Sequence, residues 1–201
     1  MNQFLRAALT AASLALASTS MQAANLSFTG SLGGDNDVRL FTFTLAADSD
    51  VTLRTWSYAG GTNASGSLIG SGGFDPIVTL FAGTGPSALL LTANDDGTGV
   101  DVDPGTGSAF DSLLEILALS AGTYTVALTE FDNFASGPTL GDGFGGNNIM
   151  GFDGRNANWA LDILSVDSAH QIPEPAGLAL AMLGLAAMRT VRRPVQPARP
   201  A

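Results

Sequence analysis

The chain has 201 residues, of which 18 are acidic, eight are arginine and one is histidine, and it contains neither lysine nor cysteine. The missing cysteines exclude a disulfide framework, a cysteine metal site and a thiol nucleophile, and the missing lysines exclude a Schiff-base lysine and a P-loop lysine. A formal net charge of −10 repels phosphate backbones, so we expect no nucleic-acid partner.

Residues 1–24 have the pattern of a secretory signal peptide. Arg6 supplies the positive charge, residues 7–17 form an apolar stretch too short to span a bilayer, and Ala23 and Ala24 offer a cleavage site of small residues. An amphipathic first helix of the folded domain is the alternative, but no polar face alternates with the apolar one. We therefore expect the chain to be exported.

Residues 25–168 are predicted to form one β-sandwich domain. Glycines divide this part of the chain into short segments in which apolar and polar residues alternate, which is typical of half-buried strands. Residues 111–119 also approach helical spacing, but the segment is short and Gly122 follows it, so a strand is favoured over a helix. The expected strands are residues 26–29, 38–46, 51–56, 77–81, 89–92, 113–119, 123–130 and 159–166.

This pattern predicts an all-β fold. No segment is long enough for the crossover helices that a parallel sheet requires, so the sheets should be antiparallel. Strands joined by long turns fit an antiparallel two-sheet sandwich of jelly-roll type, flanked by the N-terminal signal helix and a short C-terminal hydrophobic helix. The longest loops, residues 58–74, 94–110 and 131–158, are where we expect binding residues to lie.

The loop over residues 94–110 concentrates oxygen ligands beside glycines. A hard cation such as Ca²⁺ takes about six to eight oxygens, and crowded carboxylates repel one another unless a cation or water screens them. We therefore hypothesise one Ca²⁺ ion bound by Asp95, Asp96, Asp101 and Asp103, with Asp111 as a candidate further ligand. The alternative is that these are solvated turn aspartates, because the loop lacks the EF-hand pattern and matches a calcium nonapeptide only in part.

The sequence offers little for catalysis. His170 is the only histidine and lies outside the predicted domain, so neither a Ser-His-Asp triad nor a histidine zinc site can be assembled within it. The chain has no Gly-x-Ser-x-Gly nucleophile elbow, and Asp75, which precedes Pro76, is interpreted as a turn residue. We expect no enzymatic activity, although two carboxylates could formally serve a glycosidase.

Trp56, Tyr58 and Trp159 have two interpretations. Their amphipathic rings could form a platform that stacks on sugars. Both tryptophans lie at the end of an expected strand, however, where rings commonly pack into the core. We therefore favour core packing over a sugar-binding platform.

Residues 169–201 form a three-part tail. Its parts are the triplet Pro173, Glu174 and Pro175, the apolar residues 176–188, and the arginines Arg189, Arg192 and Arg193. The prolines predict a stiff, extended stalk, and the 13 apolar residues would form a helix of about 20 Å, short of a hydrocarbon core of about 30 Å. The positive-inside rule would keep the arginines in the cytoplasm and the preceding domain outside the inner membrane.

The order of these three parts resembles the PEP-CTERM sorting signal of Gram-negative bacteria. The resemblance implies that exosortase, an integral-membrane cysteine protease, recognises the tail and processes it during a transient insertion into the inner membrane. It also implies a cell-surface or extracellular location and an association with exopolysaccharide and biofilms. An ordinary C-terminal membrane anchor, which would be kept, is the alternative.

Several motifs within residues 26–166 resemble a family of exported PEP-CTERM proteins whose pattern is similar to bacterial pre-peptidase C-terminal domains. The motifs are Gly72-Gly73-Phe74-Asp75-Pro76, Leu80-Phe81, Asn94-Asp95-Asp96-Gly97, Asp111-Ser112 and Leu119-Ser120-Ala121-Gly122-Thr123-Tyr124. This resemblance implies a calcium-stabilised β-sandwich and no particular activity. We expect an exported, exosortase-sorted protein with a structural or interaction role; a carbohydrate-binding or adhesive module is the alternative, and an enzyme of unknown type is the third.

Overall fold

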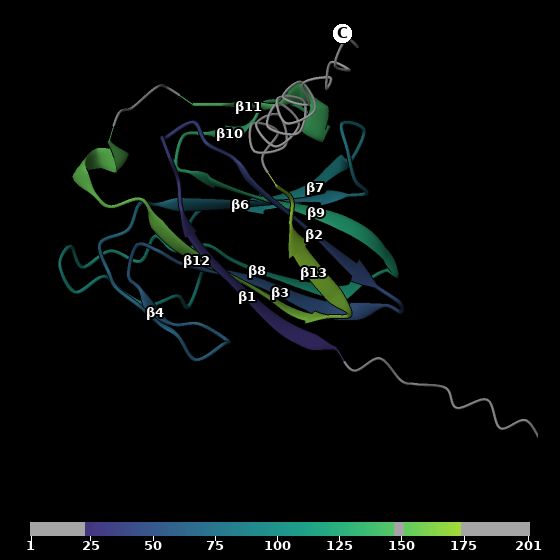
Figure 1. Ribbon diagram of the computed structural model, residues 1–201, viewed down its shortest axis with the longest axis horizontal. Coiled ribbons are helices and arrows are strands. Elements are labelled where there is room, and N and C mark those ends of the chain that lie inside the picture. The colour runs from purple at the N-terminus through teal and green to yellow at the C-terminus, as the bar shows by residue number, and fades with distance from the viewer. Residues whose placement is uncertain (1–22, 147–150, 174–201) are drawn as a thin grey trace, which may run out of the picture.

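Two antiparallel β-sheets form the body of the computed structural model, which describes residues 23–146 and 151–173 (Figure 1). The first sheet has the order β1-β12-β3-β8, formed by β1 (Ala24–Ser31), β12 (Asn158–Val166), β3 (Ser49–Trp56) and β8 (Leu113–Leu119). The second has the order β13-β2-β9-β6-β7, formed by β13 (Ser168–Gln171), β2 (Arg39–Leu45), β9 (Gly122–Glu130), β6 (Pro76–Ala82) and β7 (Leu89–Asn94). The fold is therefore all-β, as the sequence predicts.

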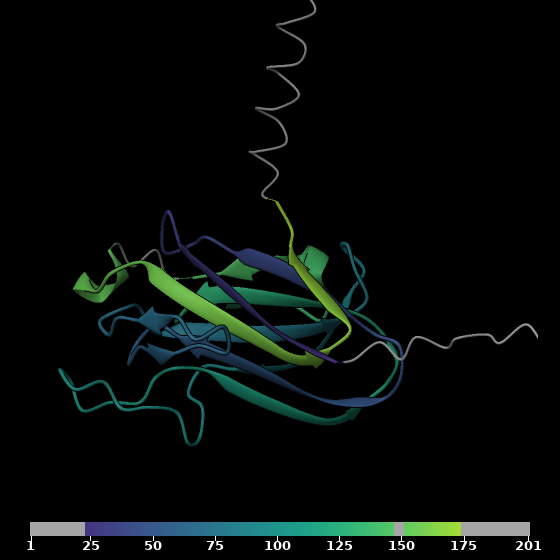
Figure 2. The same ribbon diagram turned by 60° about the horizontal axis from the view of Figure 1, so that its bottom comes forward.

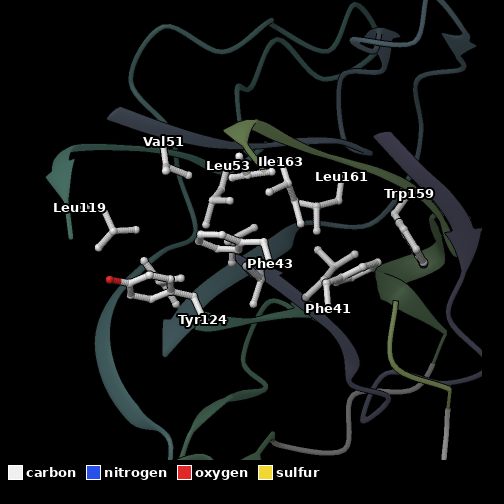
Figure 3. Close-up of a cluster of buried hydrophobic side chains, with 14 of the residues drawn as sticks. Phe41, Phe43, Val51, Leu53, Leu119, Tyr124, Trp159, Leu161 and Ile163 are labelled. Carbon is white, nitrogen blue, oxygen red and sulfur yellow. The ribbon is translucent and has the colours of Figure 1, made fainter. Parts of the chain in front are cut away.

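The core lies between the two sheets, which form stacked layers in Figure 2. Figure 3 shows side chains of β3 and β12 facing those of β2 and β9, with Phe41 and Phe43 at the centre of the contact. The ring of Phe41 meets Trp159 edge-on at 5.7 Å, and Phe43 stacks on Tyr124 at 5.1 Å. Alternation along each strand produces this arrangement, because every second side chain points to the same face of a sheet.

The outer face of the second sheet is also partly covered. Six consecutive residues of β6, from Pro76 to Phe81, are buried. Phe81 packs with Ala127 and with residues of the segment that follows β9, including Leu140 and Phe144. That segment contains the two-residue strands β10 (Phe134–Ala135) and β11 (Phe144–Gly145), which pair with each other.

All eight segments expected to be strands are strands, and residues 113–119 form β8 rather than a helix. The sequence did not reveal β13, nor the two-residue pairs β10–β11 and β4 (Gly61–Thr62)–β5 (Leu68–Ile69). Strand β13 pairs with β2 and carries the second sheet to Gln171, three positions beyond the predicted end of the domain. Its sequence, Ser-Ala-His-Gln, contains a single apolar residue and thus shows no alternation.

The predicted signal helix and C-terminal hydrophobic helix fall on residues 1–22 and 174–201, outside the described residues. Of the sorting motif, only Pro173 is described; Glu174, Pro175, Arg189, Arg192 and Arg193 are not. Within residues 23–146 and 151–173, no helix has the length and apolarity needed to cross a membrane.

Candidate functional site

Two of the four predicted calcium ligands, Asp101 and Asp103, each have an arginine partner. Asp101 accepts a hydrogen bond of 3.1 Å from Nη2 of Arg54 on β3, and Asp103 accepts one from Nη2 of Arg155. The two arginines neutralise these carboxylates, which is the role that the calcium hypothesis gives to a metal ion. Among the described residues, no three acidic or histidine side chains have an arrangement that could hold a metal ion.

Asp111, the candidate fifth ligand, has a structural role. Its carboxylate is buried and accepts hydrogen bonds from the backbone N–H groups of Ser57 and Ala59, at 2.7 and 2.9 Å, and from Oγ1 of Thr55 at 3.0 Å. These bonds fix the chain where it leaves β3. Asp95 and Asp96 lie instead beside Asp75, whose pKa their negative charges help to raise.

Arg155 joins segments that are distant in the sequence. Its guanidinium lies 3.6 Å from the centroid of the Tyr58 ring and donates hydrogen bonds to the carbonyl oxygens of Gly73 and Tyr58 as well as to Asp103. Both members of the Arg155–Asp103 ion pair are largely buried, with side-chain exposures of 17% and 5%. The hydrogen bond from Arg155 is the main cause of the lowered pKa of Asp103.

Next to this ion pair lies a pocket of about 270 Å³. Three acidic side chains line it, namely Asp75, Glu130 and Asp153, together with Arg155. Its apolar wall is formed by Tyr58, Phe110, Phe131 and Phe152. A concave site lined by rings and a few polar groups is the usual form of a small-molecule site, so this pocket is the candidate functional site.

The pairing of β6 with β9 brings Asp75 and Glu130 to the same end of the second sheet. Glu130 is the last residue of β9 and lies opposite Pro76, and the backbone N–H of Phe131 donates to the carbonyl oxygen of Asp75 at 2.7 Å. Glu130 is only 5% exposed. Among the described residues, neither Oε2 of Glu130 nor Oδ1 of Asp75 has a hydrogen-bond partner.

Burial and neighbouring acids favour the neutral forms of both carboxyl groups. Burial is the main cause that raises the pKa of Glu130 to about 8, and the negative charges of Asp35 and Asp153 add to it. Burial also raises the pKa of Asp75 to about 8, with Asp96 and Asp95 as the next causes. At pH 7, below both of these pKa values, the pocket therefore holds two carboxyl groups that are mostly protonated.

Sequence reasoning does not identify this pocket. The alternation that ends at Glu130 predicts only a strand, and the position of Asp75 before Pro76 predicts only a turn. The strand interpretation is confirmed, whereas Asp75 lies in irregular backbone directly before β6 and not in a turn. Asp75 lies beside Glu130 because β6 pairs with β9. The sequence does not show this pairing, because β7 and β8 lie between the two strands along the chain.

The three rings considered as a sugar-binding platform are buried. Trp56, Tyr58 and Trp159 are 9%, 7% and 2% exposed, which confirms the core interpretation. The indole Nε1 of Trp56 donates to Oδ2 of Asp162, and the guanidinium of Arg54 covers the Trp56 ring at 3.8 Å. The two tryptophans therefore offer no open face on which a sugar could stack, whereas Tyr58 lies in the apolar wall of the pocket.

No family model and no curated protein matches this chain.

Proposed function

We propose that this is an exported surface or extracellular-matrix protein of PEP-CTERM type, whose acidic β-sandwich of jelly-roll type has a structural or interaction role. The chain would then consist of a helical signal peptide, the sandwich, and a sorting tail that contains a short hydrophobic helix. The observation that carries it is the order of the parts of the tail: Pro173-Glu174-Pro175, an apolar run and three arginines. Exosortase would process this tail while it is inserted in the inner membrane.

The composition of the folded body supports a role outside the cell. Residues 24–172 contain three arginines and 17 acidic residues, a formal charge of −14. Such a charge keeps a protein soluble and attracts cations, including those that accompany exopolysaccharides. The continuous core between the two sheets holds this body together without disulfides, as a structural role requires.

Calcium stabilisation belongs to the same proposal and rests on the resemblance to pre-peptidase C-terminal domains. Asp95 and Asp96 are the two of the four predicted ligands that no arginine neutralises among the described residues. The carbohydrate-binding alternative loses its proposed platform because the tryptophans are buried. A ligand-binding role would have to use the pocket beside Glu130 instead.

The proposal is tested by following both ends of the chain in a Gram-negative host that has exosortase. We expect intact-mass analysis of protein recovered from outside the cell to show that the signal peptide and the tail have both been cut. Replacing the triplet by alanine, with Pro173→Ala, Glu174→Ala and Pro175→Ala together, should leave the tail uncut and the protein in the inner-membrane fraction.

A matched control changes prolines of the tail outside the triplet. Pro194→Ala with Pro197→Ala should be exported and cut like the parent chain. Recovery of the unmodified chain, with both ends intact, from the soluble cytoplasmic fraction would overturn the proposal. An uncut tail that remains in the membrane for every variant would favour the ordinary anchor.

A further inference from the structure

The pocket beside Glu130 is independent of the sorting tail, and its chemistry points to a ligand. We infer that it binds the ammonium group of a compact organic cation, of about the size of a single six-membered ring. Glu130 and Asp75 would accept hydrogen bonds from the ammonium, and the aromatic wall would hold the carbon skeleton.

Glu130 is the central observation. It is only 5% exposed, its side chain lines the pocket, and its Oε2 has no partner among the described residues. A buried acceptor without a partner is costly, so a ligand that donates a hydrogen bond there gains the energy that the free protein lacks. Oδ1 of Asp75 is a second acceptor of the same kind.

The acidic groups around the pocket favour a cation. Arg155, the one basic side chain in the lining, already donates to Asp103 and to two backbone carbonyls. Asp75, Glu130 and Asp153 are left without a basic partner in the lining, and Asp35 lies close enough to Glu130 to raise its pKa. A bound cation would stabilise the ionised forms of these carboxyl groups, whereas an anionic ligand would be repelled by them and a neutral ligand would gain nothing from their ionisation.

The acceptors and the rings fit an ammonium group better than a bare ion. An ammonium has three donors and no acceptor, which matches a site made of carboxylates. Aromatic rings attract cations electrostatically and also pack against carbon, and four rings line this pocket. The volume of about 270 Å³ lies just below the range of about 300–1,000 Å³ for small-molecule sites, so the ligand must be small.

The test uses cyclohexylammonium chloride as the probe, with the purified full chain and isothermal titration at pH 7. Cyclohexanol is the neutral control of similar shape, and calcium chloride tests for an inorganic ion. We expect binding of cyclohexylammonium, with affinity at least about tenfold lower in Glu130→Gln, since one charge-assisted hydrogen bond is lost. Glu115→Gln removes the same charge from an exposed position on β8 and should bind like the parent chain.

Titration in two buffers of different ionisation enthalpy adds a readout that a simple loss of folding would not produce. A cation in this pocket favours the ionised carboxyl groups, so binding should release protons from the parent chain and fewer from Glu130→Gln. Equal affinity for cyclohexanol, unchanged affinity in Glu130→Gln, no binding at millimolar probe, or a heat of binding with calcium alone would each overturn the inference.

Discussion

Trp56 on β3 donates its indole N–H to Oδ2 of Asp162 on β12 at 2.7 Å, so a buried carboxylate joins two neighbouring strands of the first sheet. The same oxygen accepts the backbone N–H of Ala64 at 2.9 Å, and Oδ1 accepts the hydroxyl of Ser27. Asp162 therefore connects β1, β3, β12 and the turn that follows β4.

Replacing Asp162 by alanine should destabilise the protein by about 3 kcal/mol or more, because three donors lose their acceptor at a residue that is 2% exposed. Urea unfolding measures the free energy of unfolding. Glu115→Ala, at an exposed position on the same sheet, should change it by less than about 0.5 kcal/mol. Similar values for the two variants would contradict the connecting role of Asp162.

The two arginine–aspartate pairs should differ in their contribution to stability. Arg155→Ala leaves the buried Asp103 carboxylate unpaired and should cost about 3–5 kcal/mol, as expected for breaking a buried ion pair. Asp101→Asn breaks the pair of Asp101, whose side chain is 60% exposed, with Arg54 while the guanidinium stays over the Trp56 ring, and it should cost about 1 kcal/mol or less. Urea unfolding measures the free energy of unfolding of both variants. If both lose the same amount, the buried pair contributes no more to stability than the exposed pair.

Stability should decrease as the pH rises from about 5 to about 8. The ordinary pKa values of Asp75 and Glu130 are 3.8 and 4.5, and both are raised to about 8 in the folded protein. Between these values the folded protein holds protons that the unfolded chain releases, so folding is favoured at the lower pH. Urea unfolding at several pH values should show a smaller decrease for Glu130→Gln, whereas Glu115→Gln should follow the parent chain.

Gly73 should not tolerate a side chain. A Cβ atom there would lie 2.6 Å from the carbonyl oxygen of Ser57 and 2.7 Å from that of Asn158, and both are backbone atoms. Gly73→Ala should therefore lower the free energy of unfolding by about 1–3 kcal/mol through overpacking. Gly70→Ala is the control, because nothing lies within 4 Å of the position that its Cβ would occupy. A thermal scan that gives the two variants the same melting temperature would contradict this contact.

Calcium should raise the melting temperature if the loop that follows β7 binds it. The expected effect depends on Asp95 and Asp96, so Asp95→Asn with Asp96→Asn should abolish the increase. Asp48→Asn with Asp50→Asn, which removes two acidic groups where the chain passes from β2 into β3, should preserve it. If the parent chain has the same melting temperature with calcium and with a chelator, calcium plays no part in the proposed function.

The eight long strands were predictable and the site was not, for one physical reason. Alternation such as that of Phe41 and Phe43 around Thr42 is local, so it identifies β2 without knowledge of its partners. The partners of Asp101 and Asp103 are arginines 47 and 52 positions away, and no local pattern links them. Glu130 gains its properties from burial beside Asp75, which depends on the pairing of β6 with β9.

The end of β13 has a mechanical consequence for anything attached beyond it. The backbone N–H of Ile172 donates to the carbonyl oxygen of Leu40 at 2.8 Å, so the chain is still held against β2 at that residue. Only Pro173, with its restricted φ, separates Ile172 from Glu174. An enzyme that acts at Glu174 would therefore work two residues from a backbone hydrogen bond of the folded sheet, unless β13 first separates from β2.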